Sequence, residues 1–255
     1  MSDRLKRLAS LVQKGETVAD IGTDHGYLPL FLCQKGTSPR AVLIDVNAGP
    51  LAKAKENSRE EALGNRLDFR LGDGLEPLKK GEVDCCILAG MGGLLIAELL
   101  DWDLPKTITF GKYILQPRNN VGKLIYWLTG NGFRIEKETL VKEGPRFCEI
   151  LVCRPPAEVP VRQIRASLLP DLKLEDPAFE YPDLLVEKPS ELTRAYLTAR
   201  LSEEEAVINR IRDNRTGQDG PGEGAKRELL YREGRRERLL ALLASDEKGE
   251  RKTRV

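Results

Sequence analysis

The sequence lacks most of the residues on which metal sites and disulfide frameworks depend. It has a single histidine, and its five cysteines are odd in number and include no C-x-x-C pair. Zinc and non-haem iron sites usually draw on histidine ligands, so an iron or zinc site here would need an unusual ligand set. We therefore expect no metal, buried free thiols and a cytoplasmic location.

Long hydrophobic runs are also missing. The opening residues, MSDRLKRLASLV, contain no apolar stretch of signal-peptide length, and no run of about 18 apolar residues occurs. We therefore expect no membrane partner. Positive and negative charges nearly cancel, with 41 Lys and Arg against 40 Asp and Glu. This balance excludes neither RNA nor small molecules, because a net charge near zero can hide a basic patch.

What the sequence does have is a regular alternation of segments. Short apolar runs predict strands at residues 17–21, 41–46, 67–71, 83–89, 112–116, 133–141 and 147–153. Helices are predicted between the first five strands and after the fifth, at residues 27–35, 50–63, 94–100 and 121–131. This pattern predicts an α/β, Rossmann-like fold with a mostly parallel sheet. Only a predicted turn at 142–146 separates the last two strands, so they should form an antiparallel hairpin. A sheet of this kind resembles that of class I methyltransferases more than that of dinucleotide dehydrogenases.

The C-terminal part follows a different pattern. Residues 155–189 are rich in proline and predict a linker after a catalytic domain at 1–154. Residues 190–247 predict an antiparallel coiled-coil hairpin, and residues 248–255 a disordered tail. The predicted apolar faces consist of Leu192, Tyr196, Ala199, Ala206 and Ile211 on one helix and Leu229, Leu230, Leu239, Leu240, Leu242 and Leu243 on the other. Such a hairpin could hold RNA, dimerise the chain or cap the core, and we expect a monomer or weak homodimer.

The first predicted strand leads into a loop suited to a cofactor. In ADIGTDHGYLP, residues 19–29, Asp20 ends the strand, and Gly22 and Gly26 lie in the turn before a helix. Glycines let the main chain approach a ligand, and the start of a helix offers free amides. The loop lacks the G-x-G-x-x-G spacing of dinucleotide sites. Because the Asp20 carboxylate would repel a pyrophosphate and attract an ammonium group, the loop favours S-adenosylmethionine.

Further motifs follow the next strands. Asp45 ends the second strand, where a carboxylate can accept hydrogen bonds from both ribose hydroxyls, although a turn or helix-cap role would also explain it. Asp73 and Gly74 follow the third strand in GDGL, and AGMGG and ILQP end the fourth and fifth. Since ligands of open α/β sheets bind beyond the carboxyl ends of the strands, we expect these motifs to converge.

Together, these motifs resemble those of a known family. The segments ADIGTDHGYLP, GDGL, AGMGG, ILQP and CEILV resemble the bacterial tRNA adenine-N1 methyltransferases that act on position 22 of tRNA. The resemblance implies a Rossmann-like methyltransferase domain with a coiled-coil domain after it, S-adenosylmethionine as cofactor and tRNA as partner. Two positions differ from the family pattern: Arg118 stands where many relatives have Asn, and Asp45 where a Glu is expected.

The resemblance also implies roles for individual residues. Asp24 would be the catalytic residue, because its carboxylate can stabilise the positive charge that methylation leaves on the purine; alternatively, Asp24 caps the following helix or holds a backbone amide. Cofactor contacts are expected from Asp20, Gly22, His25, Asp45, Asp73, Gly74, Ala89, Gly90 and Met91. Substrate contacts are expected from Tyr27, Arg4, Arg7, Gln116 and Arg118, with Tyr27 stacking on a flipped base.

Two alternative functions remain open at this point. One is a small-molecule methyltransferase whose hairpin dimerises the chain, and the other is a non-catalytic RNA-binding module. Arginines recur along both predicted hairpin helices, at positions 194, 200, 210, 212, 232, 235, 236 and 238. They would contact RNA phosphates or form a solvated face.

Overall fold

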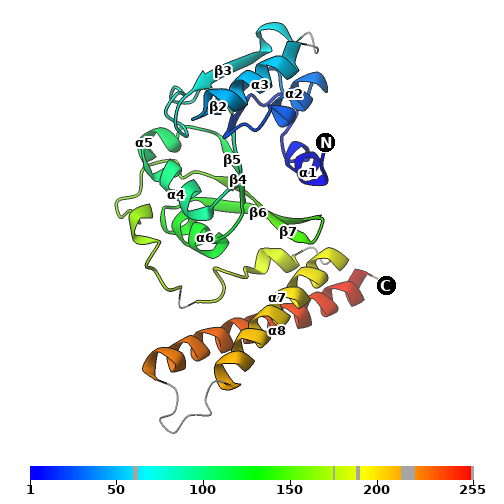
Figure 1. Ribbon diagram of the computed structural model, residues 1–255, viewed down its shortest axis with the longest axis vertical. Coiled ribbons are helices and arrows are strands. Elements are labelled where there is room, and N and C mark those ends of the chain that lie inside the picture. Colours follow the sequence, from blue (N-terminus) through cyan, green and yellow to red (C-terminus); the bar gives the residue numbers. More distant parts are fainter. Residues whose placement is uncertain (60–62, 175, 188–189, 214–221, 254–255) are drawn as a thin grey trace. The chain divides into compact units, whose positions relative to one another are not determined.

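The computed structural model describes residues 1–59, 63–174, 176–187, 190–213 and 222–253. The chain forms two compact units, Met1–Leu172 and Lys173–Val255 (Figure 1). The predicted linker at 155–189 is divided between them. Its first part packs on the sheet unit, where the Ala166 amide donates to Asp101 Oδ2 over 3.2 Å. The boundary between the compact units thus lies inside the predicted linker.

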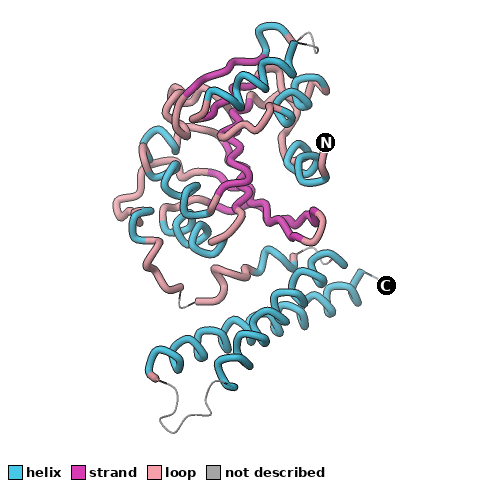
Figure 2. The backbone as a smooth tube through the Cα atoms, in the orientation of Figure 1, coloured by secondary structure: helices cyan, strands magenta, loops and turns pink. Residues whose placement is uncertain are grey.

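The first unit is built on one seven-stranded sheet (Figure 2). The strands are β1 (Val18–Ile21), β2 (Ala41–Asp45), β3 (Leu67–Leu71), β4 (Cys85–Met91), β5 (Lys112–Pro117), β6 (Arg134–Glu143) and β7 (Arg146–Arg154). Their order is β3-β2-β1-β4-β5-β7-β6, with β7 antiparallel to both β5 and β6 and the first five strands parallel. The predicted mostly parallel sheet with an antiparallel hairpin is confirmed. The hairpin turn is tighter than predicted, because Glu143 pairs with Arg146.

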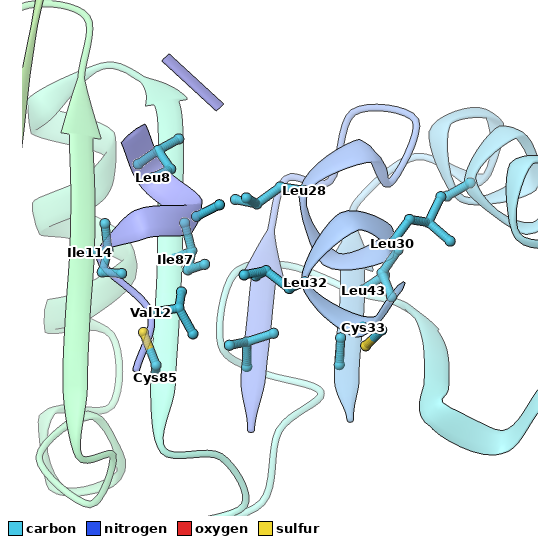
Figure 3. Packing of buried hydrophobic residues seen from close by; sticks show 14 of the residues in the cluster. Leu8, Val12, Leu28, Leu30, Leu32, Cys33, Leu43, Cys85, Ile87 and Ile114 are labelled. Atoms are coloured by element: carbon cyan, nitrogen blue, oxygen red, sulfur yellow. The ribbon is translucent and has the colours of Figure 1, made fainter. Parts of the chain in front are cut away.

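One face of the sheet is covered by α1 (Asp3–Ser10), α2 (Tyr27–Gln34) and α3 (Ala48–Arg59). Ser2 caps α1, where its side chain accepts a hydrogen bond from the Leu5 amide. Leu8 of α1 and Leu32 of α2 are buried in the same cluster as Ile87 and Ile114 of the sheet (Figure 3). Helix α1 is therefore fixed by core packing, which matters below because it carries Arg4.

Two further helices, α4 (Gly93–Asp101) and α6 (Val121–Gly130), pack on each other, and α4 contacts β4 and β5. The short helix α5 (Leu104–Thr107) lies between α4 and β5 in the chain and was not predicted. Trp127 of α6 is fully buried, with its ring 5.5 Å from that of Phe133. Doubly wound sheets require such cover on both faces because their parallel strands are apolar throughout.

The second unit contains the predicted helical hairpin, formed by α7 (Glu191–Asp213) and α8 (Glu223–Thr253), which pack on each other. Its buried face matches the predicted apolar one only in part, with Tyr196, Leu239 and Leu242 buried as predicted. Ala206, Leu230 and Leu240 are exposed, whereas the charged side chain of Glu204 is buried. The predicted disordered tail at 248–255 overlaps α8 as far as Thr253, and residues 254–255 lie outside the described residues.

Within the described ranges, no helix is long and apolar enough to cross a membrane. The same ranges contain no cluster of potential metal-ligating side chains. All five cysteines are free, and four of them are buried.

Candidate active site at the carboxyl ends of the strands

The sequence motifs lie at the same edge of the sheet. Asp20 is the penultimate residue of β1 and pairs in register with Leu43 of β2 and Ile87 of β4. Asp45 ends β2 opposite Leu71, the last residue of β3. The strand order reverses between β1 and β4. On the far side of this point, Ala89 of β4 pairs with Gln116 of β5. We refer to this edge as the rim. Ligands of open α/β sheets bind at such an edge, beside the point where strand order reverses.

Asp20 is a buried acid with little local compensation. The Asp20 carboxylate accepts a hydrogen bond from the Thr23 hydroxyl over 2.6 Å, and Asp20 is 9% exposed. Burial raises the pKa of Asp20 to about 6, against a smaller lowering by the Thr23 hydrogen bond and by the charge of Arg4. A buried carboxyl whose pKa approaches neutrality favours a cationic ligand group in contact with it.

The turn after β1 contacts the motif that ends β4. Gly22 has a φ of 72°, and the terminal methyl of Met91 lies where a Cβ on Gly22 would be. A larger residue at position 22 would therefore be strained and would displace Met91. The two motifs thus form one packed surface rather than two independent loops.

Asp24 and His25 lie in the loop between β1 and α2. The side chain of Asp24 is 86% exposed, and its Oδ1 lies 3.1 Å from His25 Nε2. The N-cap residue of α2 is Gly26, and no side chain caps the helix there. Asp24 is therefore not the N-cap residue of α2. Within the described residues, the buried His25 Nδ1 has no hydrogen-bond partner.

Asp45 at the end of β2 and Asp73 after β3 are more accessible than Asp20. The half-buried Asp45 accepts a hydrogen bond from the Asn47 amide over 2.7 Å, so it shapes the turn after β2. Asp73 is exposed, whereas Gly74 is buried with a φ of 51° and Leu99 packs close to its Cα. Asp45 and Asp73 can both offer carboxylate oxygens to a ligand at the rim.

A hydrogen-bond network joins α1 to the ends of β4 and β5. Gln116 is 3% exposed, and its Oε1 accepts from the Gly90 amide over 3.1 Å and from Arg4 Nη1 over 3.2 Å. Arg4 Nε also donates to Glu143 Oε2 over 3.2 Å. Arg4 and Gln116 were both predicted as substrate contacts, but their contact with each other has no signal in the sequence. Arg7 instead donates two hydrogen bonds to Thr139 Oγ1, so it holds α1 against β6.

Beside the rim, a cavity of about 550 Å³ opens between α1 and α2. Its lining residues are Met1, Ser2, Leu5, Tyr27, Leu30, Phe31, Gln34 and Asn57. Tyr27 is 53% exposed, and its ring lies 5.6 Å from that of His25. The exposed aromatic ring thus joins the cavity to the Asp24 loop. The cavity could not be inferred from sequence, because it depends on how α1 docks beside α2.

The strand order and the acidic, glycine-containing rim are those of Rossmann-like methyltransferases. A family model described as a methyltransferase domain matches residues 1–151. The chain belongs to this methyltransferase family. Over 152 residues it is 34% identical to the tRNA (adenine(22)-N(1))-methyltransferase of Bacillus subtilis, a match that covers 60% of this chain and 64% of that protein.

Solved structures extend the likeness to both units. The B. subtilis m1A22 tRNA methyltransferase TrmK superimposes with a TM-score of 0.78 at 27% identity, over 95% of this chain and 98% of that chain. Streptococcus pneumoniae Sp1610 in complex with S-adenosyl-L-methionine gives a TM-score of 0.70 at 26% identity, over 97% of this chain and 98% of that chain. The resemblance to the tRNA adenine-N1 methyltransferases is thereby confirmed.

Proposed function

We propose that this protein transfers a methyl group from S-adenosylmethionine to N1 of an adenine in tRNA, at position 22 as in the curated B. subtilis relative. The observation that carries the proposal is the rim itself. It brings a buried, uncompensated Asp20 and the exposed Asp24 to one edge of a methyltransferase sheet. The sequence match covers less than two thirds of that relative, so the reaction and substrate rest on this site together with the likeness.

The rim fits the proposed cofactor. A methionyl ammonium would contact Asp20, whose pKa stays at about 6 despite the lowering by the charge of Arg4, and a ribose would present its hydroxyls to Asp45. The buried His25 Nδ1, which has no hydrogen-bond partner among the described residues, could also bind the cofactor. Asp73 and Gly74 would border the adenine, and the main chain at Ala89, Gly90 and Met91 would border the methyl-transfer end. The bound cofactor supplies a methyl group activated by sulfonium.

The target adenine needs no prior deprotonation, because its N1 carries an in-plane lone pair. Methylation of N1 would leave the purine with a positive charge. The Asp24 carboxylate is proposed to stabilise that charge and to accept a hydrogen bond from the exocyclic amine. His25, 3.1 Å from Asp24, would orient it.

The proposed tRNA contacts lie around the same edge. The exposed Tyr27 would stack on a base taken out of its helix, since N1 is hidden in a base pair. Arg4, Gln116 and Arg118 lie on the β4–β5 side of the rim. The hairpin offers RNA phosphates fewer unpaired arginines than the sequence suggests, because several of its arginines pair with acidic residues of the same unit.

The function can be tested with tRNA that lacks the modification. Purified protein and cofactor labelled on the methyl group should transfer the label to this tRNA, and nucleoside analysis should recover it as 1-methyladenosine from position 22. A substrate in which that adenosine is replaced by guanosine should stay unlabelled. Label on another nucleoside would contradict the proposed base, and absence of transfer to any RNA would contradict the proposed activity.

A further inference from the structure

Two guanidinium groups flank the same small space above Gly90. This glycine lies at an irregularity at the end of β4 and has a φ of 78°. A Cβ built on it would lie 3.6 Å from Arg118 Nη2 and 3.9 Å from Arg4 Nη1. Any group that occupies this space is therefore in contact with two cations.

The two arginines differ in how their charges are balanced. The side chain of Arg4 is 25% exposed and is held by Glu143 and Gln116. Arg118 is exposed, and its guanidinium has no hydrogen-bond or ion-pair partner in the part of the chain that the structure describes. Its main chain is nevertheless fixed, because the Arg118 amide donates to the Met91 carbonyl over 2.7 Å. A fixed pair of cations with one charge uncompensated favours an anion between them.

We propose that the space above Gly90 binds a phosphate group of the RNA backbone, held between Arg4 and Arg118. This rests on the proposed function, since it assigns one contact of its substrate. The distribution of charge favours RNA over the cofactor carboxylate as the source of the anion. Acidic groups lie on the β1–β2 side of the rim, whereas the exposed Arg118 is on the β4–β5 side and faces solvent.

The first experiment measures tRNA affinity against salt concentration for the full-length protein. Arg118→Gln should weaken binding about tenfold and reduce the slope of log K against log salt by about one. Arg118→Lys should keep most of the slope, because it keeps the charge. Arg134→Gln is the matched control, since Arg134 is 74% exposed and begins β6 at the opposite edge of the sheet; it should leave both quantities unchanged.

The same variants distinguish the two sources of an anion. Titration calorimetry with S-adenosylmethionine should give the same affinity for Arg118→Gln and the unmodified protein. A loss of cofactor affinity with an unchanged salt slope would assign the site to the cofactor carboxylate and overturn the proposal. Equal tRNA affinity and slope in Arg118→Gln and Arg134→Gln would also overturn it.

A second experiment places the contact on one phosphate. RNA hairpins that contain the target adenosine are made with a single neutral methylphosphonate at either phosphate beside it. One of the two methylphosphonates should weaken binding of the RNA to the unmodified protein. The same methylphosphonate should not weaken binding to Arg118→Gln, which already lacks the contact. Additive losses at both positions would contradict the phosphate contact. If the unmodified protein methylates tRNA while this coupling is absent, only the phosphate site is wrong; if it methylates no RNA, the proposed function fails first.

Discussion

The rim of the sheet and the helical hairpin each bury a carboxylate, but they compensate its charge in opposite ways. Asp20 at the rim is 9% exposed, and its hydrogen bond comes from the neutral hydroxyl of Thr23. Glu204 in the hairpin is 3% exposed and pairs with Arg232 at 3.0 Å and Arg235 at 2.8 Å. An uncompensated buried acid indicates a ligand site, whereas a compensated one indicates architecture.

The hairpin acid should give the largest effect. Glu204→Ala leaves two partly buried guanidinium groups without their shared partner, which should destabilise the hairpin by about 3–5 kcal/mol. Both tryptophans, Trp102 and Trp127, lie in the sheet unit. Chemical unfolding should therefore show an earlier transition by far-UV circular dichroism and an unchanged one by tryptophan fluorescence.

The control for this change is Glu203→Ala, next in sequence. The Glu203 side chain is 63% exposed and pairs with Arg200 within one turn of helix. Its removal should change stability by no more than about 0.5 kcal/mol. If both signals shift together in Glu204→Ala, the two units do not unfold separately and the contrast between them is wrong.

The rim acid should make stability depend on pH in the direction opposite to that of an ion-paired carboxylate. Because the pKa of Asp20 is about 6 in the folded protein and 3.8 ordinarily, the folded state keeps its proton while the unfolded state loses it. This contribution is fully present below pH 3.8 and is lost as the pH rises through about 6, a change of about 3 kcal/mol. Asp20→Asn should remove this part of the pH dependence in urea unfolding followed by tryptophan fluorescence.

Cofactor affinity should depend on pH in the opposite direction to stability. A cationic ligand group stabilises ionised Asp20, so affinity for S-adenosylmethionine should rise with pH through about 6 in the unmodified protein and stay flatter in Asp20→Asn. An affinity that is independent of pH in both proteins would show that the ammonium group does not contact Asp20.

The smallest predicted effect concerns Asp45, which is half-buried and available to solvent. Asp45→Ala should weaken cofactor binding by about 1.5–3 kcal/mol, because the ribose hydroxyls lose a charged acceptor. Asp45→Glu, which has the carboxylate expected in relatives, should retain most of the affinity. Calorimetry that gives equal affinities for the Ala variant and the unmodified protein would contradict the ribose assignment, and tight binding of NAD would contradict the choice of cofactor.

The sheet was predictable because buried parallel strands leave short apolar runs in the sequence, and their carboxyl ends must meet at one edge. The position of β7 between β5 and β6 was not, since local patterns carry no information on which strands pair. The network of Arg4, Gln116 and Gly90 was also hidden, because it joins α1 to strands about a hundred residues away in sequence.

The hairpin shows where hydrophobic periodicity misleads. The two helices were predicted, and Tyr196, Leu239 and Leu242 of the predicted apolar faces are buried, but other residues of those faces are not. Leu230 is 72% exposed although it was placed on the apolar face, and the buried Glu204 was not considered because it is charged. A pattern that counts only apolar residues cannot detect a carboxylate that arginines on the facing helix neutralise.

The proposed reaction depends most directly on Asp24, whose exposed carboxylate is proposed to stabilise charge on the methylated base. The measurement is kcat for methyl transfer to unmodified tRNA by the unmodified protein, Asp24→Asn and Asp24→Ala, with cofactor affinity measured alongside. Both variants should bind cofactor normally and lose about 10²–10³ in kcat, because both lack the charge. The Asn variant isolates the charge, since it keeps the size of the side chain and an acceptor oxygen. Near-normal turnover by Asp24→Asn would contradict a role for the charge, and activity in both variants would show that Asp24 is not the catalytic residue.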